Sequence, residues 1–236
     1  MVSNTATFYV CTNMKVFLIL PLVVFFLACM ENATPLSDVN KAKPMKFLAL
    51  GDSYTIGESV ATEERWPVQL AKALTTNEQI VTSQIIATTG WRTDDLKRAI
   101  VAANPPSDFE FVSLLIGVNN QYQGKSAESY APEFEELLQM AVGFAGGDKS
   151  KVFVVSIPDY GYTPFGKSKR VEISEAIDKF NAVNKSITEK LGVRYFYITD
   201  LTRKGLDDPS LVANDGLHPS GKMYSLWVDR ILLGLR

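Results

Sequence analysis

Residues 46–57 read KFLALGDSYTIG, a short apolar run that stops at a Gly-Asp-Ser turn. Two later segments repeat this arrangement, because FVSLLI at 111–116 precedes Gly-Val-Asn-Asn and VFVVSI at 152–157 precedes Pro-Asp-Tyr-Gly. Short apolar runs bounded by turn residues are typical of strands buried on both faces of a parallel sheet. Weaker strand candidates lie at 80–87 and 194–198.

Helical patterns separate these apolar runs. Apolar side chains recur at helical spacing over 134–142 and 173–191, with Asn184 as the polar exception. Pro67 and Pro219 each stand at the expected first position of a helix, where proline is tolerated. The alternation of strands and helices predicts an α/β fold, a single three-layer αβα domain with a doubly wound, parallel, five-stranded sheet.

In such a sheet, ligands bind beyond the carboxyl ends of the strands. Three polar turns are expected at that edge, at 51–53, 117–120 and 158–162. We therefore expect the functional residues of this protein to lie in these turns.

The composition narrows the function classes. The chain has 236 residues, of which 46% are hydrophobic and 21% charged, with a formal net charge of −2. These values are typical of a globular domain, and no stripe of Lys and Arg indicates a nucleic-acid partner. The cysteines, Cys11 and Cys29, are both N-terminal, and His218 is the single histidine. We therefore expect neither a zinc site nor a disulfide in the folded body, and no cofactor.

The N-terminal segment predicts export. Residues 16–28 (VFLILPLVVFFLA) are apolar, but the run is shorter than the roughly 20 residues that span a membrane. It suits the core of a signal peptide, with Lys15 as the preceding positive charge if translation starts at Met14.

The end of this run, Leu27-Ala28-Cys29, resembles a bacterial lipoprotein signal, in which the cysteine becomes the acylated first residue. We expect a signal peptide over 1–29, a flexible tether over 30–44 and a folded domain over 45–236. The resemblance implies a lipid-anchored protein of the cell envelope, on the periplasmic or outer-membrane face. A plain secretory signal is the alternative.

The first residues suited to catalysis are Ser53, and Asp215 with His218. Ser53 opens the turn after the first strand, where helix capping would explain it equally well. Asp215 and His218 are three positions apart, so a turn can bring the carboxylate to one ring nitrogen and leave the other as a proton acceptor. An ordinary exposed loop is the other interpretation of that pair.

Two further residues could stabilise negative charge. Asn119 follows the 111–116 strand, and its side-chain amide could donate to an oxyanion. Gly90 follows the 80–87 strand, and its backbone N–H could approach a substrate closely. Each residue taken alone is equally well explained as part of a turn.

Taken together and in this order, the four blocks resemble the SGNH (GDSL-like) hydrolase family. They are Gly-Asp-Ser at 51–53, Gly90, Gly-x-Asn at 117–119 and Asp-x-x-His-Pro at 215–219. The resemblance implies a flavodoxin-like SGNH fold and a serine esterase with an acyl-enzyme on Ser53. It also implies His218 as base, Asp215 as its orienting residue, and the oxyanion donors Ser53 N–H, Gly90 N–H and Asn119.

Two positions depart from the family pattern. Tyr54 stands where Leu is common, and Asn120 stands where Asp is common. The second departure leaves open what supports the Asn119 loop.

The sequence alone does not identify the substrate. The family resemblance allows short-chain esters, acetylated carbohydrates, lysolipids and acyl thioesters, and the membrane anchor brings lipid and glycan partners within reach. Aromatic residues near the expected strand ends are pocket candidates, namely Tyr54, Trp91, Tyr122, Tyr160 and Tyr162. An O-acyltransferase and a non-catalytic envelope-ligand binder are the alternative functions, while no phosphate-binding glycine motif supports a nucleotide binder.

Overall fold

The protein was studied as a computed structural model, which describes residues 42–235. The expected signal peptide, its Cys29 and the expected tether up to residue 41 lie outside the described residues. Within 42–235, none of the helices is both long and apolar enough to cross a membrane.

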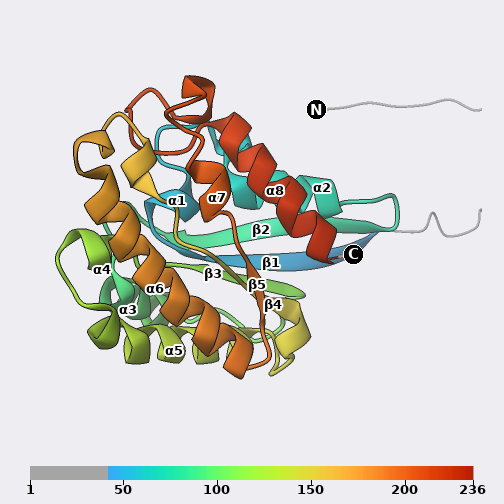
Figure 1. Ribbon diagram of the computed structural model, residues 1–236. Coiled ribbons are helices and arrows are strands. Elements are labelled where there is room, and N and C mark those ends of the chain that lie inside the picture. Colours follow the sequence, from blue (N-terminus) through green and yellow to red (C-terminus); the bar gives the residue numbers. More distant parts are fainter. Residues whose placement is uncertain (1–41, 236) are drawn as a thin grey trace, which may run out of the picture. The chain divides into compact units, whose positions relative to one another are not determined.

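A parallel five-stranded sheet forms the centre of the domain, in the order β2-β1-β3-β4-β5 (Figure 1). The strands are β1 (Lys43–Gly51), β2 (Gln79–Ala87), β3 (Phe111–Leu115), β4 (Val152–Val155) and β5 (Arg194–Phe196). The predicted α/β fold class and five-stranded sheet are confirmed. The first strand is longer than expected, because residues 43 and 44, which we assigned to the tether, already pair with β2.

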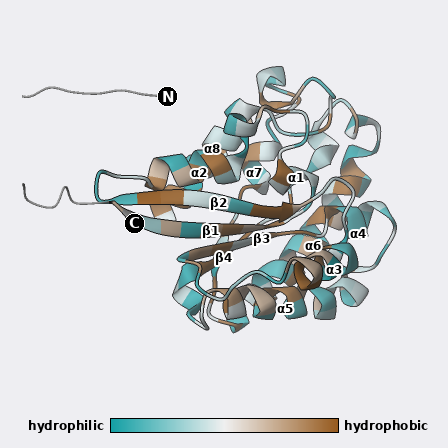
Figure 2. Ribbon diagram, turned by 180° about the vertical axis from the view of Figure 1, so that it is seen from behind, coloured by the Kyte–Doolittle hydropathy of each residue, from teal (hydrophilic) through white to brown (hydrophobic). Residues whose placement is uncertain are grey.

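Two layers of helices cover the sheet. On one face lie α2 (Trp66–Leu74) and α8 (Gly221–Leu235), and on the other lie α3 (Thr93–Ala103), α5 (Ala127–Phe144) and α6 (Arg170–Lys190) (Figure 1). Figure 2 shows apolar residues along the strands between the layers, whereas the helices carry hydrophilic residues as well. Three short helices follow strands, namely α1 (Ser53–Ile56), α4 (Val118–Tyr122) and α7 (Thr199–Thr202).

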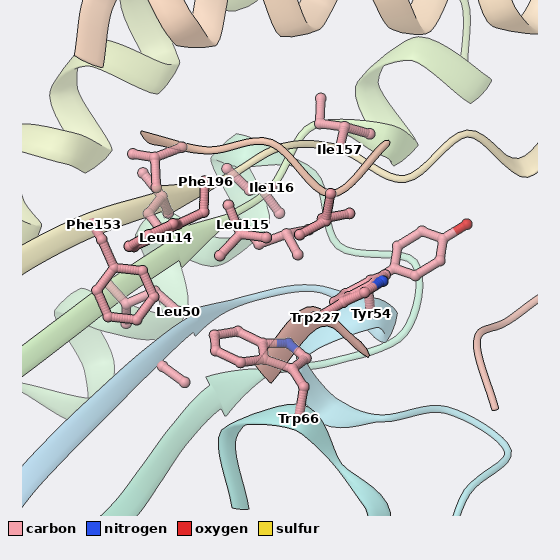
Figure 3. Packing of buried hydrophobic residues seen from close by; sticks show 14 of the residues in the cluster. Leu50, Tyr54, Trp66, Leu114, Leu115, Ile116, Phe153, Ile157, Phe196 and Trp227 are labelled. Atoms are coloured by element: carbon pink, nitrogen blue, oxygen red, sulfur yellow. The ribbon is translucent and has the colours of Figure 1, made fainter. Parts of the chain in front are cut away.

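Aromatic side chains link the α2/α8 layer to the sheet. Trp66 of α2 and Trp227 of α8 are both fully buried (Figure 3). The ring of Trp66 contacts Phe47 of β1 at 6.0 Å and Phe153 of β4 at 6.5 Å between centroids. Burying a side chain of this size contributes roughly 1.5–3 kcal/mol or more, so this face is a major part of the core.

The opposite face contains the polar exception of the predicted 173–191 helix. Asn184 of α6 is fully buried, and its side-chain oxygen accepts a hydrogen bond of 2.6 Å from the Tyr130 hydroxyl. The same hydroxyl lies 2.8 Å from the backbone oxygen of Ile116, just past β3, so the two acceptors share its one proton. The buried hydroxyl thus gives the amide oxygen of Asn184 a partner in the core, whereas the amide nitrogen has none.

The last helix begins later than the sequence pattern indicated. Helix α8 starts at Gly221, and Pro219 instead forms an isolated antiparallel bridge with Val212. The N–H of Ala213 donates to the backbone oxygen of His218 at 2.7 Å. The missing N–H of Pro219 costs nothing in this bridge, because its neighbours make the hydrogen bonds. Pro219 therefore belongs to the bridge that closes the His218 loop, and it is not the first residue of α8.

Strand register explains why distant sequence blocks meet. Gly51, the last residue of β1, pairs with Ala87 of β2 and with Leu115 of β3, so the three strands end level with one another. The direction of winding reverses between the adjacent strands β1 and β3, because the chain leaves β1 toward β2 and leaves β3 toward β4. Such a reversal opens a crevice at the carboxyl edge of a sheet, which is where Ser53, Gly90 and Asn119 follow their strands.

Candidate active site

A cavity of about 190 Å³ lies at this edge of the sheet, and we call it the central cavity. Its walls come from the segments after β1, β2, β3 and β4 and from the His218 loop. The lining residues are Ser53, Tyr54, Thr89, Gly90, Val118, Asn119, Tyr122, Tyr160, Phe165, Leu217 and His218. Among residues 42–235, no group of three or more His, Cys, Asp or Glu side chains could hold a metal ion.

Ser53 is the first residue of α1, and Asp52 caps that helix. The Oδ1 atom of Asp52 accepts from the N–H of Tyr54 at 3.0 Å, and its backbone oxygen accepts from Thr55 and Ile56. The N–H of Ser53 precedes these hydrogen bonds, as the first amides of a helix do, and remains free for a ligand. The capping role considered for Ser53 thus belongs to its neighbour.

The carboxyl group of Asp52 is fully buried, and its Oδ2 atom has no hydrogen-bond partner. Burial raises the pKa of Asp52 to about 7, against the lowering effect of the hydrogen bond from Tyr54. A large share of Asp52 is therefore uncharged near neutral pH.

His218 lines the same cavity and is only 8% exposed. Its Nδ1 atom is 2.6 Å from Oδ2 of Asp215, and its backbone N–H donates to Oδ1 of the same carboxylate at 2.9 Å. The carboxylate thus fixes the orientation of the imidazole ring through Nδ1. The other ring nitrogen, Nε2, is left to accept a proton. The structure gives no direct hydrogen bond between Ser53 and His218, and such bonds often tighten only when substrate is bound.

Asp215 has a further partner that the sequence did not reveal. The hydroxyl of Ser59 donates to Oδ2 of Asp215 at 2.7 Å, across 156 positions of the chain. Partial burial acts to raise the pKa of the Asp215 carboxyl, but hydrogen bonds from Ser59, His218 and the backbone outweigh it. The pKa of Asp215 lies well below its usual range, so the group is an anion at any physiological pH.

Gly90 lies in a turn closed by a 3.3 Å hydrogen bond from the N–H of Trp91 to the oxygen of Thr88. Its φ of +83° is a conformation that favours glycine, and a Cβ added there would meet nothing within 4 Å. The missing side chain leaves the backbone open to the central cavity.

Asn119 reaches the cavity from α4, after β3. Its Nδ2 atom donates one hydrogen bond of 2.9 Å to the backbone oxygen of Trp91. Because an amide nitrogen carries two protons, the second remains available to a ligand. The same hydrogen bond ties the turn after β2 to the turn after β3.

Asn120 answers the question of what supports this loop. It is buried, its Oδ1 accepts from the N–H of Thr93 at 3.1 Å, and its Nδ2 donates to the Thr93 hydroxyl at 2.7 Å. The Thr93 hydroxyl in turn donates to Glu133 of α5. The amide oxygen of Asn120 therefore accepts the hydrogen bond from the backbone, at a position where the family usually has a carboxylate. The carboxylate of this cluster comes from Glu133 instead.

The aromatic pocket candidates divide into two groups. Tyr54, Tyr122 and Tyr160 line the central cavity, and the ring of Tyr54 packs at 5.4 Å from that of His218. Trp91 and Tyr162 do not line it. The Trp91 side chain packs against the hydrophobic core, and its backbone oxygen accepts the hydrogen bond from Asn119.

The ring of Tyr162 instead lies under the guanidinium of Arg170. Sequence reasoning also missed Phe165, which lines the cavity and is 52% exposed. No strand or motif precedes Phe165, so its position had no signal in the sequence.

The fold and these side chains together define an αβα hydrolase with a serine and an aspartate-bound histidine at one cavity. The family model of the GDSL-like Lipase/Acylhydrolase family matches residues 49–226, and this chain belongs to that family. The expected SGNH relationship is confirmed, and the protein is a carboxylic ester hydrolase. A search of the curated proteins gave no significant match.

Solved structures with the same fold include enzymes of different substrate preference. An extracellular lipase from Streptomyces rimosus has a TM-score of 0.65 and 17% identity, covering 81% of this chain and 100% of its own. An acetyl-xylooligosaccharide esterase from Geobacillus has a TM-score of 0.63 and 17% identity, covering 82% and 95%. An esterase from Pseudoalteromonas has a TM-score of 0.60 and 17% identity, covering 79% and 94%. Identities this low establish the fold alone.

Proposed function

We propose that this protein hydrolyses carboxylic esters through an acyl-enzyme on Ser53. The observation that carries the proposal is the 2.6 Å contact between Asp215 and His218 Nδ1, on the same cavity that Ser53 lines. A serine hydroxyl is a weak nucleophile until a neighbouring base accepts its proton. With Nδ1 engaged by Asp215, Nε2 of His218 is the nitrogen that would accept it.

In the proposed first step, the Ser53 oxygen attacks the ester carbonyl while His218 takes the hydroxyl proton. The imidazolium so formed is stabilised by the Asp215 carboxylate, which stays charged because its pKa is held low. His218 then protonates the leaving alcohol, and the acyl group remains on Ser53. Water attacks the acyl-enzyme with His218 again as base, which releases the acid and restores the serine.

Three donors would stabilise the oxyanion that forms in both steps. They are the N–H of Ser53, the N–H of Gly90 and the second Nδ2 proton of Asn119, all beyond level strand ends. Losing one such donor typically lowers kcat by about 10²–10³-fold, or roughly 3–4 kcal/mol. We therefore assign the oxyanion hole to these three groups.

The substrates that fit this proposal are short-chain, carbohydrate or lysolipid esters. One fold relative is by its title an acetyl-xylooligosaccharide esterase and another an extracellular lipase, so both kinds of leaving group occur on this fold. The central cavity, at about 190 Å³, favours a small acyl group over a long chain.

The proposal is tested with p-nitrophenyl acetate and a fluorophosphonate probe. Ser53→Ala and His218→Ala should each lower kcat by about 10³-fold or more while the far-UV circular dichroism stays native. The probe should label the wild-type chain once and spare Ser53→Ala. Ser186→Ala, a change at an exposed serine of α6, serves as the matched control. Near-normal turnover by Ser53→Ala, or labelling at another residue, contradicts the mechanism.

A further inference from the structure

A second cavity adjoins the central one. It has a volume of about 530 Å³ and lies between the α4–α5 loop, the segment after β4 and the start of α6, and we call it the outer groove. Three aromatic residues, Tyr122, Tyr160 and Phe165, line both cavities. The outer groove thus borders the central cavity, which Ser53 lines, at these three rings.

The shared aromatic residues form one cluster. The centroids of the Tyr122 and Tyr160 rings are 6.2 Å apart, and each is 6.3 Å from Phe165. Tyr160 is buried and its hydroxyl donates to Gln121 at 2.9 Å, so it forms a fixed base. Tyr122 and Phe165 are 59% and 52% exposed. Exposed rings held at the rim of a cavity commonly mark a ligand-binding surface.

The outer groove also has a polar wall. Its residues are Gln121, Lys125, Ser168, Lys169 and Glu172, and the apolar Ile173, Ala176 and Phe180 line the groove as well. This set offers hydrogen-bond donors from the ammonium groups, acceptors from the carboxylate, and both from the hydroxyl and amide. Its charges are of mixed sign, so it selects neither a polyanion nor a polycation.

We propose that the outer groove binds the sugar units of an oligosaccharide ester, as the leaving-group site of the reaction. The proposal rests on the esterase function proposed above. A sugar ring presents apolar C–H faces, which suit Tyr122 and Phe165, and hydroxyls that both donate and accept, which suit the polar wall. The acyl group would lie in the smaller central cavity at Ser53.

A fatty acyl chain fits the outer groove less well. Burying it against Lys169 and Glu172 would desolvate charged groups without offering them any hydrogen bond, which is unfavourable. An oligosaccharide replaces the lost water with its own hydroxyls. The polar wall therefore favours a glycan over a lipid as the occupant.

This location has a kinetic consequence. Binding energy from a part of the substrate remote from the reacting bond can be used to lower the barrier at that bond. The catalytic efficiency should therefore rise with the number of sugar units on the leaving-group side. An activated aryl acetate places a single aryl ring on the leaving-group side, so it cannot span the outer groove as a tetramer does.

The test compares hydrolysis of p-nitrophenyl acetate with hydrolysis of acetylated xylo-, cello- and chito-oligosaccharides of one to four units. For at least one series, kcat/KM should rise tenfold or more from one unit to four. In the Lys169→Ala/Glu172→Ala variant, the ratio of tetramer to aryl acetate kcat/KM should fall tenfold or more. The matched control, Glu175→Ala/Lys190→Ala, removes the same two charges from exposed positions of α6 outside the groove and should change the ratio less than twofold.

Binding of the same tetramers to the Ser53→Ala protein, followed by calorimetry, tests the groove without turnover. Tight binding that the groove variant weakens supports the site even if no ester is hydrolysed, in which case the esterase proposal alone fails. Three results overturn the groove proposal. They are a flat length dependence in every series, an equal ratio in the groove variant and its control, or a preference for lysolipids over all glycan esters.

Discussion

Ser59 has two unusual features at the scale of a single residue. Its φ of +64° lies in the left-handed region that side chains rarely adopt, and its hydroxyl donates to Asp215 at 2.7 Å. A conformation of this kind typically costs about 1 kcal/mol or more and persists where the surroundings impose it. We interpret Ser59 as a positioning residue that holds the Asp215 carboxylate against His218.

Removing the Ser59 hydroxyl should lower activity independently of stability. We expect Ser59→Ala and Ser59→Gly to lower kcat/KM for p-nitrophenyl acetate about tenfold, because a hydrogen bond to a charged group contributes about 1.5 kcal/mol. Ser59→Gly should be the more stable of the two in urea, since glycine accepts the positive φ. Full activity in Ser59→Gly would show that the hydroxyl does not position the carboxylate.

Asp52 should make stability depend on pH in the direction opposite to most carboxylates. Burial raises its pKa from 3.8 to about 7, so between these values the folded protein binds more protons than the unfolded chain. The free energy of unfolding should therefore fall as pH rises through this window, by up to about 4 kcal/mol at pH 7 and above. Carboxylates with lowered pKa, such as Asp215, finish titrating by about pH 5 and do not mask the effect.

Urea denaturation between about pH 5 and 8 measures this slope. Asp52→Asn mimics the protonated carboxyl and keeps the acceptor for the N–H of Tyr54, so the slope should vanish in that variant. An unchanged slope in Asp52→Asn would assign the titration to another group.

At the scale of elements, the site depends on turns joined across the sheet edge. Asn120 links α4 to the first residue of α3, and Glu133 of α5 completes that link. Asn119, the residue before Asn120 in the chain, lines the central cavity. The position of the proposed oxyanion donor is therefore set by contacts among three helices rather than by its own loop.

We expect Asn120→Ala to destabilise the fold by about 1–3 kcal/mol, because it leaves the buried N–H of Thr93 without an acceptor. It should also lower kcat. Exchanging the two groups in the double variant Asn120→Asp/Glu133→Gln keeps one carboxylate and one amide in the cluster. Chemical denaturation and aryl acetate kinetics should show that variant closer to the wild type than Asn120→Ala. The reverse order would contradict the supporting role of this cluster.

At the scale of the whole molecule, we propose that the hydrolase domain is held at a membrane by acylation of Cys29. The support is the sequence itself, an apolar run that ends at Leu27-Ala28-Cys29. Each buried CH₂ of an acyl chain contributes about 0.8 kcal/mol, so two or more chains anchor a protein stably.

Cys29→Ala should move the protein from the membrane pellet to the soluble fraction after cell fractionation. Ser186→Ala, the exposed control position on α6, should leave the protein in the pellet. Pelleting of Cys29→Ala with membranes would contradict the anchor.

Most of the framework was predictable because its signals are local. Short apolar runs ended at turn residues, so the five strands and their parallel arrangement followed from patterns within each segment. The start of α8 was predicted wrongly, since Pro219 suits a helix start and an edge bridge equally well. Only the packing of Val212 beside it distinguished the two.

The sequence by itself determined the sheet, the order of its blocks and the residues able to form a serine hydrolase site. The tertiary structure alone decided that Ser59 reaches Asp215, that Asn120 meets Thr93 and Glu133, and that Phe165 joins Tyr122 in the lining of the outer groove. The physical reason is the separation along the chain over which each kind of interaction acts. Strand and turn preferences act between neighbours in the chain, whereas these contacts join side chains far apart in sequence and exist only once the sheet and helices have packed.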